Sequence, residues 1–256
     1  MLYVAVRAAR RAGDYIARAY DERDTLTIEK KQKRDYVTEV DRKAETTITR
    51  EIKKHYPDHG IVAEESASTN PNSPFQWYID PLDGTTNFVH GYPHFAVSIA
   101  LWKYGKPFLA VIHDPMRNET FEAQSGNGAF LNRRRLRVTP TTEMSEVIFA
   151  SGLPGYRWDE GMDHFQKRMD NCMRATGAYR RGGSAALDLA YVAAGRLDAY
   201  WEAGLCSWDI AAGILLVQEA GGMATDLHAR SINLNKGDVL AANDALHQKF
   251  VDLLKV

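Results

Sequence analysis

The apolar pattern of this chain changes its period twice, and that change constrains the fold more than any other feature. In the first 56 residues, apolar side chains recur every three or four positions, which is typical of two amphipathic helices. Short β-rich runs follow, among them "FAVSIALWKY" and "FLAVIHD", which we expect to form an antiparallel pair around "GKP". Strand-like and helical runs then alternate to the end. We therefore predict two helices on a largely antiparallel sheet over residues 1–138 and an α/β lobe over residues 139–256.

Charge and cysteine content narrow the classes of function. With 32 basic and 33 acidic residues the formal net charge is −1, so the chain has no overall positive field for nucleic acid. The basic runs at 30–34 and 133–137 are more typical of solvated turns than of a polyanion site. Cys172 and Cys206 are too few for a disulfide framework and lack zinc spacing. Arginines interrupt the first apolar segment, so we expect a reduced, cytoplasmic chain that is neither secreted nor membrane-spanning.

The stretch "YIDPLDGTTN" at residues 78–87 places two aspartates three positions apart. A regular strand would send Asp80 and Asp83 to opposite faces. Because Pro81 donates no hydrogen bond and has a fixed φ, we predict that the strand ends there and that a turn brings both carboxylates together. Gly84 tolerates a tight backbone, and a helical turn starting at "TTNF" would offer free N–H groups to an anion.

Carboxylates beside an anion site repel the anion unless metal ions lie between them. Hard oxygen ligands suit Mg²⁺, which proteins commonly hold with a few carboxylates and substrate phosphate. Glu64 and Glu65 end an apolar strand in "VAEES", and Asp209 begins an apolar helix in "WDIAAG". Taken singly, these features are more typical of an Asx turn, a solvated glutamate pair and an N-cap.

Two other acid-rich classes do not fit these residues. The haloacid-dehalogenase phosphatases need a nucleophilic aspartate two positions before the second one, where this chain has Pro81. An EF-hand loop needs a different spacing of acids and a closing glutamate, which "DPLDGTTNFVHG" lacks.

Four segments taken in order resemble the inositol monophosphatase family. They are "VAEES", "WYIDPLDGTTNFVHGYPHFAVSIAL", "GSAALDLAYVAAGRLDAYWE" and "WDIAAGILLVQEAGG". The resemblance runs from the first helix through the last and is strongest to bacterial members, one of which also takes part in transcription antitermination. It implies an α+β / α/β fold, a layered αβαβα sandwich shared with fructose-1,6-bisphosphatase. It also implies a cytoplasmic homodimer, with RNA polymerase or antitermination factors as further partners.

The resemblance assigns a role to each acidic motif. It implies that Glu64, Asp80 and the Leu82 carbonyl hold a first Mg²⁺, that Asp80, Asp83 and Asp209 hold a second, and that Glu64 lies near a weaker third. Glu64, Glu65 and Thr85 are implied to be catalytic, and Glu65 and Thr85 would orient the attacking water. The resemblance further implies that the N–H groups of Gly84 and Thr85 bind the phosphate and that Glu202, with the turn Gly183, Ser184 and Ala185, binds substrate hydroxyls. Asp83 and Asp209 are also implied to contact the substrate.

The activity implied is Mg²⁺-dependent hydrolysis of inositol monophosphates by in-line attack of an activated water. Fructose 1,6-bisphosphate, 3′-phosphoadenosine 5′-phosphate and an antitermination role that does not need the phosphatase site stay as alternatives. Family members carry a lysine that here is Lys30 or Lys31, and they are sensitive to lithium; Cys206 stands where animal members often have histidine. His90 and His94 are interpreted as structural.

Overall fold

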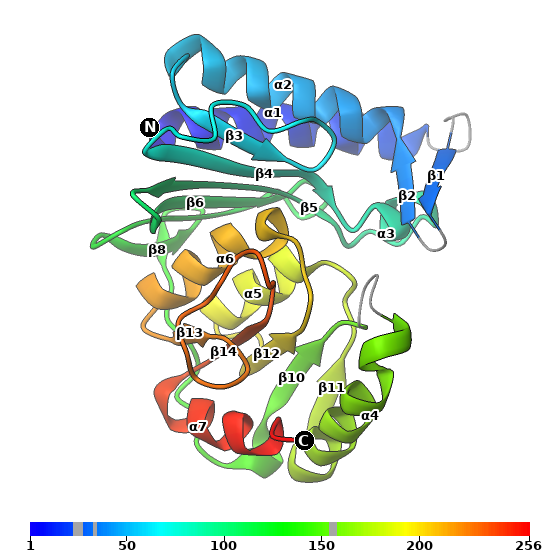
Figure 1. Ribbon diagram of the computed structural model, residues 1–256, viewed down its shortest axis with the longest axis vertical. Coiled ribbons are helices and arrows are strands. Elements are labelled where there is room, and N and C mark those ends of the chain that lie inside the picture. The colour runs from blue at the N-terminus through cyan, green and yellow to red at the C-terminus, as the bar shows by residue number, and fades with distance from the viewer. Residues whose placement is uncertain (23–27, 33–34, 154–157) are drawn as a thin grey trace.

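The computed structural model describes residues 1–22, 28–32, 35–153 and 158–256. Helices and sheets alternate in five layers, αβαβα (Figure 1). Helices α1 (Leu2–Asp21) and α2 (Glu39–His55) cover one face of a seven-stranded sheet, and α5 (Ala185–Ala193) and α6 (Ser207–Glu219) cover the other. A five-stranded sheet follows, and α4 (Trp158–Ala175) and α7 (Asp244–Leu253) form the last layer. The expected layered sandwich is confirmed.

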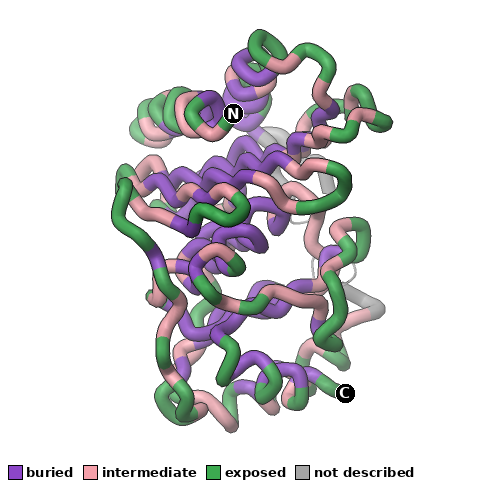
Figure 2. Tube along the Cα trace, turned by 90° about the vertical axis from the view of Figure 1, so that its left-hand side faces the viewer, coloured by how far each residue is buried: buried purple, intermediate pink, exposed green. Residues whose placement is uncertain are grey.

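The larger sheet has the strand order β3-β4-β5-β6-β7-β8-β9, and only β3 and β4 run parallel. Its strands are β3 (Gly60–Ala63), β4 (Phe75–Asp83), β5 (Ala96–Lys103), β6 (Lys106–Asp114), β7 (Glu119–Gln124), β8 (Gly128–Leu131) and β9 (Arg134–Arg135). Alternation along β5 divides its side chains between two cores. Val97 and Ile99 pack toward α1 and α2, whereas Ala96 and Ala100 pack toward α5 and α6. Figure 2 shows the resulting buried middle layers.

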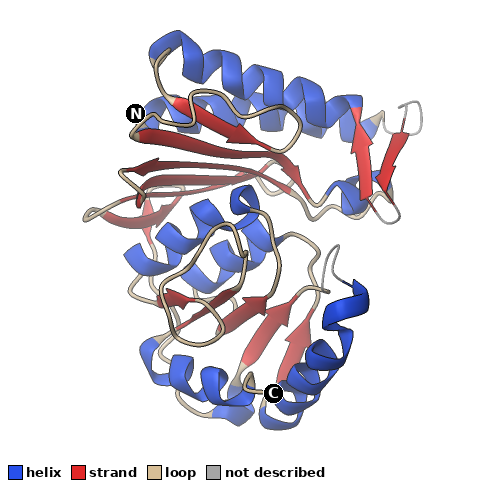
Figure 3. Cartoon of the chain, viewed as in Figure 1, coloured by secondary structure: helices blue, strands red, loops and turns tan. Residues whose placement is uncertain are grey.

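The smaller sheet has the order β11-β10-β12-β14-β13, with β10 parallel to both of its neighbours. Its strands are β10 (Ile148–Ser151), β11 (Ala178–Arg180), β12 (Ala199–Glu202), β13 (Met223–Thr225) and β14 (Val239–Ala242). Helices α5 and α6 are apolar on almost all sides because a sheet lies against each of their broad faces (Figure 3). The boundary at residues 138 and 139 stays a prediction, since this shared helical layer joins the two sheets in one core.

Local signals located most elements but not all. The sequence "TEVD" at residues 38–41 has the form of a capping box and predicts the start of a helix there. The structure confirms this prediction, with Thr38 and Asp41 as the two members of the capping box before α2. The hairpin of β1 (Ile28–Gln32) and β2 (Asp35–Thr38) was not anticipated, because its basic residues obscure any strand alternation. Lys30 and Lys31 lie in β1, but their side chains are outside the described part of the chain. Among the helices in the described ranges, none combines the length and apolar character needed to cross a membrane.

Candidate active site

A cavity of about 180 Å³ opens where β3, β4 and β12 end and where α3 (Thr85–Val89), α5 and α6 begin. Every residue assigned by the sequence to the site lines this cavity, except Glu65. The lining residues from that set are Glu64, Asp80, Leu82, Asp83, Gly84, Thr85, Gly183, Ser184, Ala185, Glu202 and Asp209. Segments about 150 residues apart in the chain therefore converge on one space, whereas the roles assigned to the residues stay predictions.

The prediction that the strand ends at Pro81 is wrong: β4 continues to Asp83. Asp80 pairs with Ser98 of β5 and Asp83 pairs with Ala96, so three steps on β4 match two steps on β5. This is a β-bulge, and a bulge tolerates proline because its extra residue leaves the hydrogen-bonded ladder. The extra residue also resets the side-chain alternation. Asp80 and Asp83 consequently share the sheet face that Ala96 presents to α5 and α6.

Asp83 joins the end of β4 to the beginning of α5. Its Oδ2 accepts hydrogen bonds from Ser184 Oγ at 2.6 Å and from the Ala186 N–H at 2.7 Å. Burial nevertheless raises the pKa of Asp83 to about 6, against these hydrogen bonds, which lower it. The N–H groups at the start of α5 thus fix the position of the Asp83 carboxylate, but their hydrogen bonds only partly compensate for its loss of hydration.

The other carboxylates crowd around Asp80. Burial and then Glu64, Asp83 and Asp209 raise the pKa of Asp80 well above its usual range. Asp209 occupies the third position of α6, where its Oδ2 accepts a 2.7 Å hydrogen bond from the Cys206 N–H. Burial and Asp83 raise the pKa of Asp209 as well, and a hydrogen bond with the Asp80 side chain lowers it in part.

This donor set fits a divalent cation. Four acidic side chains and the Leu82 backbone supply hard oxygen ligands around one cavity, and a cation there would offset the repulsion from neighbouring carboxylates that helps to raise the pKa values of Asp80 and Asp209. Within the described ranges, no three His, Cys, Asp or Glu side chains already stand at ligand distances around one point. Instead, the oxygens accept hydrogen bonds from Leu82, Ser184, Ala186 and Cys206.

Thr85 begins the short helix α3, and Asp41 lies directly behind it. Thr85 Oγ1 lies 2.9 Å from Asp41 Oδ1 and 3.0 Å from the Leu82 carbonyl oxygen. The other oxygen of Asp41 accepts hydrogen bonds from Thr38, and burial raises the pKa of Asp41. Sequence reasoning identified Asp41 only as a member of the capping box. The contact between Asp41 and Thr85 depends on how α2 packs against β4, which the local sequence pattern does not encode.

Gly84 makes the tight turn between β4 and α3. Its φ is 99°, which favours glycine, and a Cβ there would lie 3.0 Å from the His94 carbonyl oxygen. Glu65 follows Glu64 in the chain, and its N–H donates to Glu45 Oε2 at 2.7 Å. Its water-orienting role stays a prediction.

Two further acidic side chains, Glu202 and Asp188, line the same cavity. Glu202 ends β12, accepts a 2.6 Å hydrogen bond from the Tyr200 hydroxyl, and has its pKa raised to about 7 by burial. Asp188, in the first turn of α5, is 4% exposed. Burial, Glu202 and Asp83 raise its pKa well above the usual range, whereas Arg181 lowers it. Arg181 and Asp188 line the cavity but were not predicted, because the helical run "SAALDLAYVAAG" does not show which side faces a site.

These pKa values predict how pH affects the metal-free protein. Folding raises the pKa of Asp83 to about 6 and that of Glu202 to about 7, so their protonated forms favour the folded state. That stability is present below about pH 4 and is lost as the pH rises through about 6 and 7. Mg²⁺ should offset the loss, by about 2.7 kcal/mol at a hundredfold excess over its Kd. The Tm measured with Mg²⁺ should therefore exceed the Tm measured with chelator by a margin that grows as the pH rises. A margin that shrinks with rising pH would contradict this expectation.

Comparison with known proteins gives consistent matches. The family model described as "Inositol monophosphatase family" matches residues 1–255. The chain is 47% identical to "Nus factor SuhB" of Pseudomonas aeruginosa, over 95% of this chain and 91% of that protein. It is 43% identical to "Inositol-1-monophosphatase" of Mesorhizobium japonicum, over 100% of this chain and 96% of that protein. The crystal structure of extragenic suppressor protein SuhB from Bartonella henselae aligns with a TM-score of 0.95 at 43% identity, covering 99% and 97% of the two chains.

Proposed function

The chain belongs to the inositol monophosphatase family, and on that premise we propose that it is a Mg²⁺-dependent enzyme that hydrolyses myo-inositol 1-phosphate to myo-inositol and phosphate. Membership supports a phosphatase; the metal and the substrate are our proposal. The observation that carries it is the bulge in β4, which brings Asp80 and Asp83 onto one face of the sheet, where they line a polar cavity together with Glu64 and Asp209.

The residues that would hold the ions divide into two overlapping groups. Glu64, Asp80 and the Leu82 carbonyl suit a first Mg²⁺, and Asp80, Asp83 and Asp209 suit a second. Their four negative charges balance two ions, and the charge of a phosphate monoester leaves room for a third. When bound, Mg²⁺ supplies Lewis acidity that lowers the pKa of water and stabilises charge on the leaving oxygen.

Thr85 and Asp41 would orient the attacking water. A threonine hydroxyl has one hydrogen, and Asp41 Oδ1 is positioned to accept it. The lone pairs of Thr85 Oγ1 then remain to accept a hydrogen bond from the water, which directs an oxygen lone pair of that water toward phosphorus. We assign Glu65 to the same task from the other side. The new O–P bond forms as the P–O bond to inositol breaks in line, and the leaving oxygen takes up a proton.

The remaining residues would hold the ester. The N–H groups of Gly84 and Thr85, which line the cavity, would donate hydrogen bonds to the phosphate, and Gly183, Ser184 and Ala185 form the wall beside Asp83. Glu202 would accept hydrogen bonds from ring hydroxyls while Tyr200 keeps its carboxylate in place.

A substrate panel with saturating Mg²⁺ tests the assignment. We expect kcat/KM for myo-inositol 1-phosphate to exceed that for fructose 1,6-bisphosphate and 3′-phosphoadenosine 5′-phosphate. In the described part of the chain, the cavity of about 180 Å³ offers several carboxylates to hydroxyls and one cationic side chain, Arg181, to a second anion. Released phosphate is measured under identical conditions for each ester. Far faster turnover of either alternative would show that the substrate is misassigned.

A second function is supported by the relatives named Nus factor SuhB. We propose that the chain is also a cytoplasmic, homodimeric partner of the transcription machinery, and that this role does not need the phosphatase site. The exposed arginines Arg133, Arg134 and Arg135 provide a basic surface on the sheet edge, away from the cavity.

A further inference from the structure

Asp188 is a buried acid that no part of the proposed chemistry uses. It is 4% exposed, and it is the one charged residue of α5. Ser184 and Ala186, which lie four and two residues earlier in the chain, bind Asp83, whereas Asp188 lies farther along the same helix and lines the cavity itself.

The carboxylate of Asp188 has no hydrogen-bond donor among the residues that the structure describes, and no cation within ion-pair distance there. Buried carboxylates in proteins are almost always paired or hydrogen-bonded, because an unpaired one costs several kcal/mol. By comparison, Glu202 has the Tyr200 hydroxyl and Asp83 has Ser184 and Ala186. Asp188 lines the cavity, so its missing donors must come from what the cavity contains.

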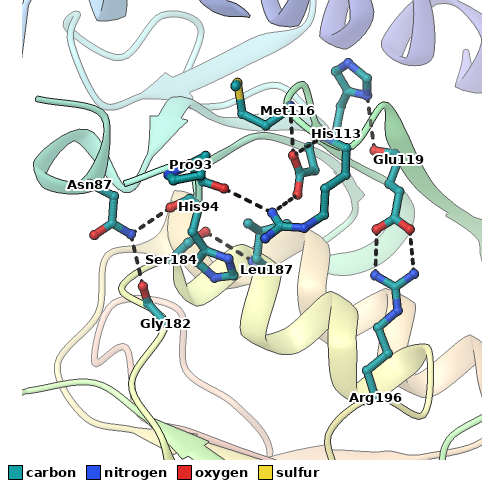
Figure 4. Close-up of polar contacts among 12 residues, drawn as sticks. Asn87, Pro93, His94, His113, Met116, Glu119, Gly182, Ser184, Leu187 and Arg196 are labelled. Carbon is teal, nitrogen blue, oxygen red and sulfur yellow. Dashed lines mark hydrogen bonds and ion pairs between the residues drawn. The ribbon is translucent and has the colours of Figure 1, made fainter. Parts of the chain in front are cut away.

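A second unpartnered group lies next to it. His94 is 7% exposed, and its buried Nε2 has no hydrogen-bond partner within the described ranges. Gly182 separates the two side chains: a Cβ on Gly182 would lie 2.7 Å from His94 Nε2 and 2.8 Å from Asp188 Oδ1. Figure 4 shows the His94 ring beside the start of α5, where Asn87 donates to the carbonyls of His94 and Gly182.

Asp188 and Gly182 also line a neighbouring cavity of about 320 Å³, which His94 lines as well. A hydroxyl group suits this wall, because it donates to a carboxylate and accepts from an imidazole N–H.

We infer that Asp188 is a specificity-determining residue that accepts hydrogen bonds from hydroxyl groups on the alcohol part of the substrate. The inference rests on the proposed phosphatase function and narrows it to esters of polyhydroxylated alcohols. Glu202 and Asp188 line the same cavity, and together they would accept hydrogen bonds from the hydroxyl groups of the substrate.

The test compares two esters that differ only in their hydroxyls, myo-inositol 1-phosphate and cyclohexyl phosphate. With Asp188→Ala, we expect kcat/KM for the inositol ester to fall about ten- to a hundredfold, mainly through KM, as for a lost hydrogen bond to a charged acceptor. The value for cyclohexyl phosphate should change less than about threefold, since that ester makes no such bond. Asp188→Asn, which keeps an acceptor oxygen, should recover part of the loss.

The matched control is Asp198→Ala. Asp198 is also buried, but it does not line the cavity and it accepts a hydrogen bond from the Ile148 N–H, so its loss should lower Tm and affect both esters alike. Asp188→Ala should not lower Tm, because no protein group depends on that carboxylate. Equal losses on both esters, or a changed Mg²⁺ requirement, would overturn the inference in favour of a structural or metal-binding role. If the wild-type protein hydrolyses neither ester, the proposed function itself fails and this inference fails with it.

Discussion

Replacing Asp83 with asparagine should abolish most phosphatase activity while leaving the fold intact. Asp83 faces the same cavity as Asp80 and Asp209, and its charge would help to neutralise an ion shared with them. Loss of one such electrostatic group typically costs ~2.7–4 kcal/mol of transition-state stabilisation, or about 10²–10³ in kcat. The amide keeps the shape of the side chain and an oxygen that can accept from Ser184 or Ala186. Phosphate release from myo-inositol 1-phosphate at saturating Mg²⁺ measures the loss.

One control separates this effect from general damage. Asp198→Asn changes a buried aspartate outside the cavity and should retain nearly full activity. Near-normal activity of Asp83→Asn would remove Asp83 from the proposed metal site. The same variant tests the second proposed function, because an antitermination role that does not need the site should survive. If that role is lost together with activity in a folded protein, the two functions are not separable.

Replacing Thr85 with valine should lower kcat by about 10²-fold, at the lower end of the range for positioned acid–base groups. Valine has nearly the same shape but removes the hydroxyl that lies 2.9 Å from Asp41 Oδ1. Because this hydroxyl would orient water rather than bind the ester, KM should change little. Steady-state kinetics on myo-inositol 1-phosphate distinguishes the two parameters.

Thr86→Val is the matched control for this change. Thr86 is the next residue of α3, is exposed, and does not line the cavity, so its replacement should leave kcat unchanged. A Thr85 variant that raises KM at constant kcat would assign the residue to substrate binding instead of water orientation. Equal effects of the two valine substitutions would point to a general disturbance of α3.

Most of the layered fold could be predicted because its elements carry strong local signals. The stripe that includes Ala5, Ala9 and Ile16 predicted α1, and "TEVD" predicted where α2 begins. The hairpin β1–β2 could not be predicted, because pairing rather than apolar alternation defines it. The sequence also did not predict that three further residues belong to the site, namely Asp41, Arg181 and Asp188. Each of them reaches the site through packing between distant elements.

At Pro81 the expected loss of a ladder hydrogen bond is correct, but the strand does not end there. Proline does leave the hydrogen-bonded ladder, as expected from its missing N–H. The chain meets this requirement with a bulge instead of a turn, because β5 continues to pair with β4 on both sides of the proline. The expected convergence of Asp80 and Asp83 therefore arises by another route, the reset of side-chain alternation.

The central claim is that the carboxylates gathered by this bulge use Mg²⁺ to hydrolyse a phosphate ester. Its most direct test is phosphate release from myo-inositol 1-phosphate by protein freed of metal with a chelator and then titrated with Mg²⁺. We predict no release above background without metal and full recovery as Mg²⁺ is restored. Undiminished hydrolysis by the metal-free protein, or no hydrolysis at any Mg²⁺ concentration, would contradict the account.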